Sequence, residues 1–509
     1  MRLPGLPAAP GKNLTEPLGL QGINYGDNFR DGDLEESQNL STRRFPAIAT
    51  RNAREQLTEY SGVTALGAWE ALVAVSGTDL LYDGDIVGSV TAGEKQMSVV
   101  NTKLVIWPDK VYLDLDSMSV KPLADSLSGS GGVFTTNTLT VSGWGDLTQH
   151  FSVGDTVEIS GSSQTGNNKY VTIKELTATV LTAANDSFTA VSDSGTLSIA
   201  RNIPDLDYIC ESNNRLWGCD TETRSIYASA LGDPSNFYTY EGLSTDSYAV
   251  AVGGEGDFTG CCRLGSSVLF WRERKLYKIM GGFPAEYSMV SYDIEGVKAG
   301  CHKSLRIIND MLYYLGPHGV YRYNGGTPQL VSEVFGQKKF SDGSAGTEGE
   351  KYYLSVMDGN TARLLVFDTK YNLWLREDDT NVIDFAQMGG RLYFCDDEGG
   401  VWLADSGAED PDILWGCRFT PLYESISGRK KYKKLLLRVL IPKGGWMETD
   451  VKFDGRPWTT LGKLTGKTED VKTLVIPINR VDRLQIRIRG KGPCAILGVS
   501  REYLMGSDR

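Results

Sequence analysis

The sequence predicts an all-β protein: a β-propeller body with an inserted small β-barrel-like module and a C-terminal β-sandwich. Three observations predict this fold class. Aromatic-rich hairpins recur along the chain, Gly and Tyr are abundant with 58 and 24 residues among 509, and no stretch has a strong helical pattern. Many glycines beside many aromatic residues are typical of short strands joined by tight turns. Hydrophobic residues make up 40% of the chain, which is enough to build folded cores.

Residues 1–65 are polar, Gly-rich and irregular, as in "GINYGDNFRDGDLEESQNLSTRRFPAIATRNARE". They show neither a helical nor a strand period, so the sequence predicts an extended N-terminal arm. The arm is either disordered or docked on the rest of the chain. We favour docking because its apolar residues need burial. These residues are Ile23, Phe29, Leu40, Phe45, Pro46 and Ile48.

The propeller is predicted over residues 66–124 and 202–411, and ring closure through an N-terminal strand is compatible with the sequence. In "MLYYLGPHGVYRYNGG", residues 311–326, two aromatic-rich runs flank a Gly-Pro turn, which indicates a hairpin. Similar hairpins are expected at 102–116, 214–229, 267–282, 351–378 and 390–405. From residue 205 to 405 they recur about every 40 to 50 residues, the spacing of four-stranded propeller blades.

One hairpin turn resembles the Asp-box of sialidase-like propellers, whose pattern is S-x-D-x-G-x-x-W. In "CDDEGGVW", residues 395–402, Asp397, Gly399 and Trp402 match the pattern, and Cys395 replaces the Ser. The resemblance implies a structural element, in which the Asp caps the turn and the Trp packs beneath it. A chance hairpin match is the alternative.

Residues 125–201 differ in composition from the flanking sequence. They contain Thr- and Val-rich runs such as "FSVGDTVEISG" and "KYVTIKELTATVLTA", with almost no aromatic residues. The glycine- and serine-rich "SLSGSGG" precedes them as a flexible join. We therefore expect a small all-β module inserted through a propeller loop, with a tip that projects towards a neighbour.

Residues 412–509 read as a C-terminal β-sandwich, because segments such as "KKLLLRVLIP" alternate between apolar and polar residues. In "RLQIRIRG", Leu484, Ile486 and Ile488 are expected on one face and Arg483, Gln485, Arg487 and Arg489 on the other. The arginine row is either solvated surface or an interface with an acidic partner.

The densest basic run is "GRKKYKK", residues 428–434. It is either an exposed strand edge protected by lysines or a charged contact with a neighbouring subunit or with DNA phosphate. The candidate interface charges are Lys430, Lys431, Lys433, Lys434, Arg487 and Arg489.

The sequence offers no strong catalytic or metal-binding motif, so we expect no enzymatic activity, no metal and no cofactor. The three histidines, His150, His302 and His318, lie in no metal-ligand spacing. No nucleophile elbow, P-loop or dinucleotide fingerprint is present. With 64 acidic residues, a carboxylate pair for glycoside hydrolysis stays open.

The bulk composition constrains partners and compartment. A net charge of -12 argues against tight nucleic-acid wrapping, yet it suits an acidic wall past which DNA slides. The eight cysteines form no CxxC pair, so we expect buried, reduced thiols, with disulfides or metal as the alternative. No run approaches the length of a membrane span, and no signal peptide is evident. We expect a soluble protein made in a cytoplasm.

Three segments together resemble the tail nozzle proteins of short-tailed bacteriophages, also called tail-hub or packaged-DNA stabilisation proteins. The first is Gly22-Ile23-Asn24 followed by "GDLEESQNLSTRRFPAIATRNAR". The second is "NNRLWGCDTETRSIYASALGDPSNFYTY", residues 213–240, and the third is the ending "DRLQIRIRGKGPCAILGVSREYLMGS". The resemblance covers most of the chain apart from the inserted module.

The resemblance implies a β-propeller protein that forms a hexameric tube below the portal and its adaptor. The tube retains packaged double-stranded DNA and forms the channel for its ejection, without sequence-specific binding. It implies a virion-tail location after assembly in the host bacterial cytoplasm, and contacts with tail fibres or spikes. Two alternatives compete: a receptor- or glycan-binding tail propeller, which needs exposed aromatics in a cleft, and a glycan-cleaving tail enzyme, which needs a carboxylate pair with one raised pKa.

Overall fold

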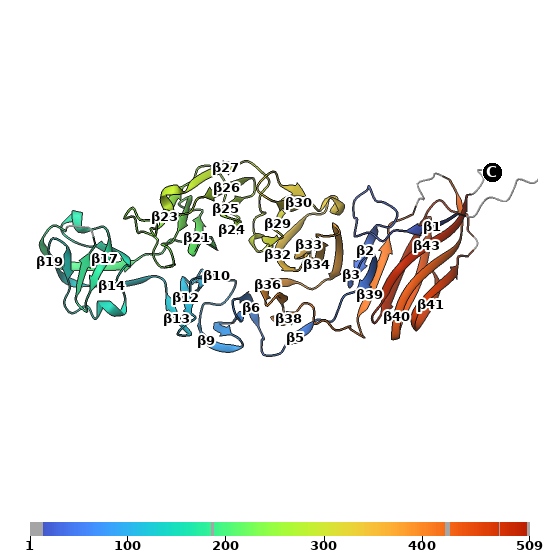
Figure 1. Cartoon of the computed structure of the whole chain (residues 1–509), viewed down its shortest axis with the longest axis horizontal. Helices are drawn as coiled ribbons and strands as arrows, with labels where there is room; N and C mark the ends of the chain where they lie inside the picture. Colours follow the sequence, from blue (N-terminus) through green and yellow to red (C-terminus); the bar gives the residue numbers. More distant parts are fainter. Residues whose placement is uncertain (1–13, 185–187, 423–427, 478, 506–509) are drawn as a thin grey trace, which may run out of the picture. The chain divides into compact units, whose positions relative to one another are not determined.

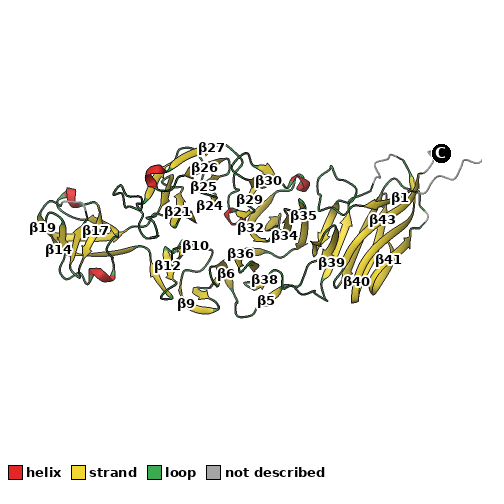
Figure 2. Ribbon diagram, in the orientation of Figure 1, coloured by secondary structure: helices red, strands yellow, loops and turns green. Residues whose placement is uncertain are grey.

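The computed structural model describes residues 14–184, 188–422, 428–477 and 479–505 (Figure 1). Seven four-stranded antiparallel sheets form a seven-bladed propeller arrangement, a six-stranded barrel is closed, and a nine-stranded sheet includes the C-terminal strands. Figure 2 shows that strands dominate. Within the described residues the helical segments are single 3-10 turns, namely η1 (Leu147–Gln149), η2 (Thr165–Asn167), η3 (Pro284–Glu286), η4 (His302–Ser304) and η5 (Glu333–Phe335). The predicted all-β fold class is confirmed.

The blades follow the chain in order. Blades 1 and 2 consist of β6 (Val63–Ala68), β7 (Leu72–Ser76), β8 (Asp79–Tyr82), β9 (Asp85–Ser89), and β10 (Gln96–Val100), β11 (Lys103–Trp107), β12 (Val111–Asp114), β13 (Ser119–Pro122). Blades 3 and 4 consist of β20 (Tyr208–Ser212), β21 (Arg215–Asp220), β22 (Ser225–Ala228), β23 (Tyr248–Ala251), and β24 (Gly260–Leu264), β25 (Ser267–Arg272), β26 (Lys275–Met280), β27 (Ser288–Tyr292).

Blades 5 and 6 consist of β28 (Arg306–Ile308), β29 (Met311–Gly316), β30 (Gly319–Tyr323), β31 (Gln329–Leu330), and β32 (Phe340–Glu348), β33 (Lys351–Asp358), β34 (Thr361–Asp368), β35 (Leu373–Asp378). Blade 7 consists of β36 (Val382–Met388), β37 (Arg391–Asp396), β38 (Val401–Leu403) and β5 (Glu55–Leu57). The hairpins expected from the sequence all form. The expected N-terminal strand is β5, which pairs with β38 and places Leu57 opposite Val401.

The chain separates into two compact units, one of residues 59–317 and 323–328, and one of the remaining residues. In the first unit, aromatic side chains fill the space between blades 3 and 4. Trp217, Phe270 and Tyr277 belong to one buried cluster there. Such rings bury large apolar areas and prefer offset or edge-to-face contacts. The rings of Trp217 and Tyr287, for example, meet edge to face with their centroids 5.1 Å apart.

The inserted module, between blades 2 and 3, is a closed barrel. Its strands are β14 (Asp125–Phe134), β15 (Thr138–Thr140), β16 (Thr156–Ser160), β17 (Tyr170–Leu176), β18 (Val180–Ala183) and β19 (Val191–Arg201). They pair in the order β14-β15-β18-β17-β16-β19. Alternate residues such as Val157, Ile159 and Ile173 point into a core of mostly aliphatic side chains, to which Phe134, Trp144, Phe151 and Phe188 add four aromatic rings. The first and last strands span residues 125–201, the bounds expected from composition.

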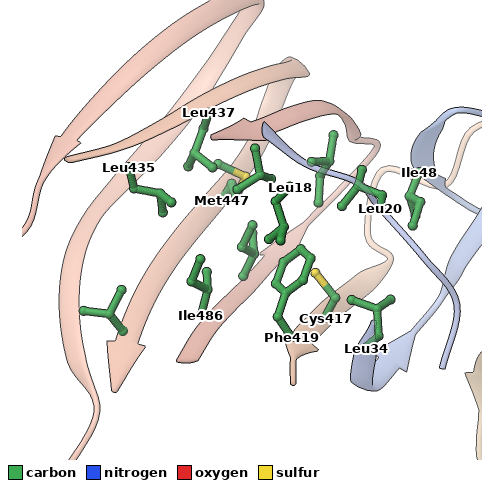
Figure 3. Close-up of a cluster of buried hydrophobic side chains, with 14 of the residues drawn as sticks. Leu18, Leu20, Leu34, Ile48, Cys417, Phe419, Leu435, Leu437, Met447 and Ile486 are labelled. Carbon is green, nitrogen blue, oxygen red and sulfur yellow. The ribbon is translucent and has the colours of Figure 1, made fainter. Parts of the chain in front are cut away.

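The second unit contains a nine-stranded sheet, which we call the terminal sheet. Its strands are β1 (Leu14–Leu18), β2 (Leu34–Gln38), β3 (Leu40–Arg44), β4 (Ala47–Thr50), β39 (Leu414–Phe419), β40 (Lys430–Phe453), β41 (Thr459–Val475), β42 (Leu484–Lys491) and β43 (Ala495–Met505). The pairing of β40 changes at Pro442–Gly445: residues up to 440 pair with β43, and residues from 446 pair with β42. Side chains from both halves, including Leu437 and Met447, belong to one apolar core (Figure 3).

The N-terminal residues are not a separate extended arm. β2 pairs with β39, and both β1 and β4 pair with β43, so the first strands complete the terminal sheet. Of the apolar residues that needed burial, Ile23, Leu40 and Ile48 are at most 2% exposed, whereas Pro46 is exposed. The strands were missed because each has only four or five residues, too few to establish a period of two.

Candidate functional site

The arginine row of β42 lies on the outer side of the terminal sheet. Leu484, Ile486 and Ile488 are fully buried and alternate with the polar residues, as predicted. The register places Arg487 opposite Asp450 and Arg489 opposite Glu448 on β40. Arg487 donates two hydrogen bonds to Asp450 at 2.9 and 2.7 Å, and Arg489 donates two to Glu448 at 3.0 and 2.7 Å. The acidic partner of this row therefore lies within the chain, and an external interface at Arg487 and Arg489 stays a prediction.

Replacing Arg487 with methionine should lower the free energy of unfolding by about 2 kcal/mol, because it leaves a buried carboxylate without its cation. The Asp450 side chain is 1% exposed and keeps only the Thr460 hydroxyl and the more distant Arg489. The matched control is Arg489→Met, where the arginine is 47% exposed, so a loss of under about 1 kcal/mol is expected. Urea unfolding followed by circular dichroism measures both, and equal losses would contradict the assignment.

The basic run 428–434 is not an exposed strand edge. β40 is a central strand that pairs with β41 on one side and with β43 on the other. Lys430 is fully buried, and its Nζ donates to the Asp482 carbonyl oxygen at 2.7 Å, so its assignment as an interface charge is wrong. A register shift between Tyr432 and Lys434 reverses the alternation of the strand, so the Lys434 side chain points outward.

The other three lysines differ in exposure. Lys431 and Lys434 are exposed, and Lys433 is half-buried. Lys434 lies 3.8 Å from Glu502 of the neighbouring strand. Surface ion pairs of this kind are weak, so the ammonium groups of Lys431 and Lys434 are accessible to a binding partner. Their role in an interface stays a prediction.

In the Asp-box-like turn, the capping carboxylate belongs to Asp396 rather than Asp397. Asp396 accepts hydrogen bonds from the backbone N–H of Gly400 at 2.8 Å and from the indole of Trp402 at 2.7 Å. Asp397 instead accepts from the Asn381 side chain at 3.0 Å. Gly399 has φ of +82°, which favours glycine. The turn therefore supports blade 7, and the capping role belongs to Asp396 while Gly399 and Trp402 keep the positions matched in the motif.

The histidines and cysteines lie in no metal-binding group within the described part of the chain. No group of three or more His, Cys, Asp or Glu side chains there could hold a metal ion. Burial lowers the pKa of His302 to about 4, whereas His150 contacts Asp125 at 3.2 Å. All eight cysteines are free thiols and are buried or half-buried. Across the same residues, no helix has the length and apolarity needed to cross a membrane.

One carboxyl group has the raised pKa that the glycan-cleaving alternative requires of its acid. Burial, and next the charge of Asp405, raise the pKa of Glu348. Tyr353 donates to Glu348 at 3.3 Å, and Asn52 donates to Asp405 at 3.0 Å. A carboxyl group with a raised pKa beside a hydrogen-bonded carboxylate is one requirement for glycoside hydrolysis, although it also occurs at structural sites.

Replacing Glu348 with glutamine should raise the melting temperature at pH 7 and leave it unchanged at pH 4. Because the folded pKa lies above the unfolded value of 4.5, the folded state binds more protons between the two values, and stability falls as pH rises through that window. Glutamine removes this cost and still accepts from Tyr353. Calorimetry at both pH values measures the two melting temperatures. Glu350→Gln, at an exposed residue, is the control. A higher midpoint at pH 4 alone would contradict the assignment.

A polar cleft of about 280 Å³ lies beside residues 21–33 and was not expected from the sequence. Arg30 and Arg322 line it together with Asp33 and Glu333, so its formal charges balance. The Asp33 carboxylate accepts hydrogen bonds from the Asn24 side chain at 2.8 Å and from the backbone N–H of Arg30 at 2.7 Å. This arrangement fixes the segment and does not select a charged ligand.

Comparisons with known proteins identify no family for the chain. No protein-family description and no curated protein match the chain. Among solved structures it is similar to BamB from Moraxella catarrhalis, at 11% identity, a TM-score of 0.36, and coverage of 70% of this chain and 97% of that one. An exo-β-1,3-galactanase from Phanerochaete chrysosporium has 9% identity and a TM-score of 0.24, with coverage of 58% and 94%. At these scores neither carries a functional argument.

Proposed function

We propose that the chain is a structural virion protein that forms the hexameric tail nozzle, or tail hub, of a short-tailed phage. It sits below the portal and adaptor, retains packaged DNA and forms the channel for its ejection. In this proposal it works without catalysis or a cofactor, and it contacts tail fibres or spikes. It assembles in the host bacterial cytoplasm and resides in the virion tail.

The observation that carries this proposal is the terminal sheet. Two of the three segments that resemble tail nozzle proteins begin near residues 22 and 482, more than 400 residues apart. They meet in this sheet, where β4 pairs with β43 and β2 reaches β42 through β39. A likeness shared by both ends of the chain is expected if those ends build one domain with one role.

The charge of the chain supports a passive channel for DNA. With a net charge of -12, the protein repels phosphate and gains no counterion-release energy from binding it. A channel that held DNA through many lysines would slow ejection. The acidic balance instead suits a wall along which the duplex moves.

Negative-stain imaging of the purified chain, alone and mixed with a portal–adaptor complex, tests the proposal. We expect a six-fold ring, or additional density below the adaptor. A chain that stays monomeric and ignores the adaptor would overturn it. The matched variants Lys431→Glu and Lys434→Glu, against Lys472→Glu on β41, then test whether the exposed lysines of β40 contribute to assembly.

A glycan-cleaving tail enzyme is the second candidate, favoured by the raised pKa of Glu348 beside Asp405. It predicts release of reducing sugar from host-surface polysaccharide, lost in Glu348→Gln. No activity in the native chain argues for the nozzle alone, and activity that is unchanged in the variant excludes Glu348 as the catalytic acid.

A further inference from the structure

A long ordered loop, residues 229–247, joins β22 to β23 in blade 3, and we call it the blade 3 loop. Loops of this length are usually functional or disordered. Here Arg215, which is 1% exposed, fixes the conformation. Its guanidinium donates to the carbonyl oxygens of Ser229 at 2.8 Å, Ser244 at 2.7 Å and also Asp246. The Asp246 carboxylate accepts from two N–H groups of the loop, Gly242 at 2.6 Å and Leu243 at 3.0 Å.

The blade 3 loop is docked on the barrel within the same compact unit. Asn236 accepts from the Thr156 N–H at 2.9 Å, and the Thr156 and Thr239 hydroxyls are 2.6 Å apart. The rings of Tyr170 on β17 and Tyr238 on the loop stack with centroids 4.7 Å apart and planes inclined by 21°. Barrel and blade therefore meet in a defined geometry, and junctions between modules are preferred positions for ligand sites.

Aromatic side chains remain accessible at this junction. Tyr240 is 58% exposed and Tyr170 is 37% exposed, although one face of its ring lies on Tyr238. Tyr227 and Tyr238 pack against the same buried cluster, and Tyr170 stacks on Tyr238. Burial, and next the phenols of Tyr170, Tyr227 and Tyr240, raise the pKa of Tyr238. The Tyr240 hydroxyl donates to the Phe237 carbonyl oxygen at 3.2 Å, and the Tyr170 hydroxyl accepts from the Asn202 side chain at 3.3 Å, so both rings are held by hydrogen bonds.

Polar groups lie between these rings. Asn202 donates to the Glu158 carboxylate at 2.6 Å and to the Tyr170 hydroxyl at 3.3 Å. Glu241 accepts from Thr172 at 3.0 Å. Carboxylate oxygens accept several hydrogen bonds each, so Glu158 can accept from a ligand as well as from Asn202. We name the set Tyr170, Tyr227, Tyr238, Tyr240, Glu158 and Asn202 the tyrosine surface.

We propose that the tyrosine surface binds a neutral saccharide. Pyranose rings have an apolar C–H face, which packs on an aromatic ring, and a rim of hydroxyls that both donate and accept. The tyrosine surface offers exposed rings together with phenol oxygens and the Glu158 carboxylate as hydrogen-bond acceptors at one junction. It contains no arginine or lysine, so it disfavours uronic and sialic acids relative to uncharged sugars. This binding goes beyond the nozzle role, and its failure leaves that role untouched.

Saturation-transfer NMR with the full chain tests the proposal, using maltohexaose, chitohexaose, mannohexaose and cellohexaose as four neutral probes and oligogalacturonate as the charged comparison. We expect transfer to the ring protons of at least one probe. Tyr240→Ala and Tyr170→Ala should each weaken that binding by about tenfold, the upper range for a lost aromatic contact. Tyr292→Ala, which removes a 44% exposed tyrosine on β27, is the matched control and should bind normally.

Three results would overturn the proposal. They are no transfer to any of the four probes at millimolar concentration, transfer that survives both Tyr170→Ala and Tyr240→Ala, and transfer only to oligogalacturonate. Because Tyr170 also stacks on Tyr238, Glu158→Gln provides a variant that keeps the stack. It should weaken binding while hydrogen exchange of residues 229–247 stays unchanged. A protein contact rather than a saccharide site is indicated if these residues become protected only on assembly with the adaptor.

Discussion

Replacing Arg215 with methionine is expected to lower the free energy of unfolding by about 4 kcal/mol, among the largest effects of any single substitution in the protein. The guanidinium is buried and donates to carbonyl groups of the blade 3 loop, including Ser229 and Ser244. Methionine has similar length but no donor, so these buried acceptors lose their partners. The loop should also exchange its amide hydrogens faster than the rest of blade 3.

Thermal unfolding and hydrogen exchange measure this prediction together. Arg274→Met is the matched control, because Arg274 is exposed in the turn between β25 and β26, and a change below about 0.5 kcal/mol is expected. Arg215→Lys keeps the charge but reaches fewer carbonyls, and it should lie between the two. Native protection of residues 229–247 in Arg215→Met would contradict the anchoring role.

Gly22→Ala should be the second severe substitution, with an expected loss of about 3 kcal/mol from overpacking. An added Cβ would lie 2.5 Å from the Trp374 carbonyl oxygen and 2.9 Å from its nitrogen. The backbone cannot retreat, because the Ile23 N–H donates to that oxygen at 2.8 Å and the Leu34 N–H donates to the Gly22 oxygen at 2.9 Å.

Gly19→Ala is the matched control for Gly22→Ala. It lies in the same segment, and its Cβ would meet only the Gln21 side chain at 3.6 Å, an ordinary contact. Limited proteolysis should cut Gly22→Ala within residues 19–33 and leave Gly19→Ala intact. Equal resistance of the two variants would show that the segment does not depend on this close approach. The result would also explain why a glycine stands at a position that resembles the nozzle proteins.

The parts of the fold that could be predicted are those determined by residues close together in the sequence. Each blade hairpin carries its own alternation and turn, as in residues 311–326, so the propeller follows from the repeats. The barrel followed from a change of composition at its two ends. The strands β1–β4 could not be predicted, because they are short and because β1, β2 and β4 pair with strands that lie hundreds of residues away. Their burial depends on a sheet that the local sequence does not show.

The site residues show the same division. The alternation of Leu484 and Arg487 was predictable, whereas the pairing of Arg487 with Asp450 needed the register between β40 and β42. Lys430 was misassigned because a register shift interrupts the alternation. The tyrosine surface was missed because Tyr170 and Tyr238 stack only when barrel and blade meet. A repeat of tyrosines in residues 227–240 was the available signal.

The most direct test of the account is the fate of packaged DNA in phage particles assembled without this chain. The nozzle role predicts heads that package DNA and then lose it, with retention restored when the purified chain is added back. Particles that hold their DNA but fail to adsorb to the host would contradict the nozzle role and indicate a receptor-binding tail protein instead.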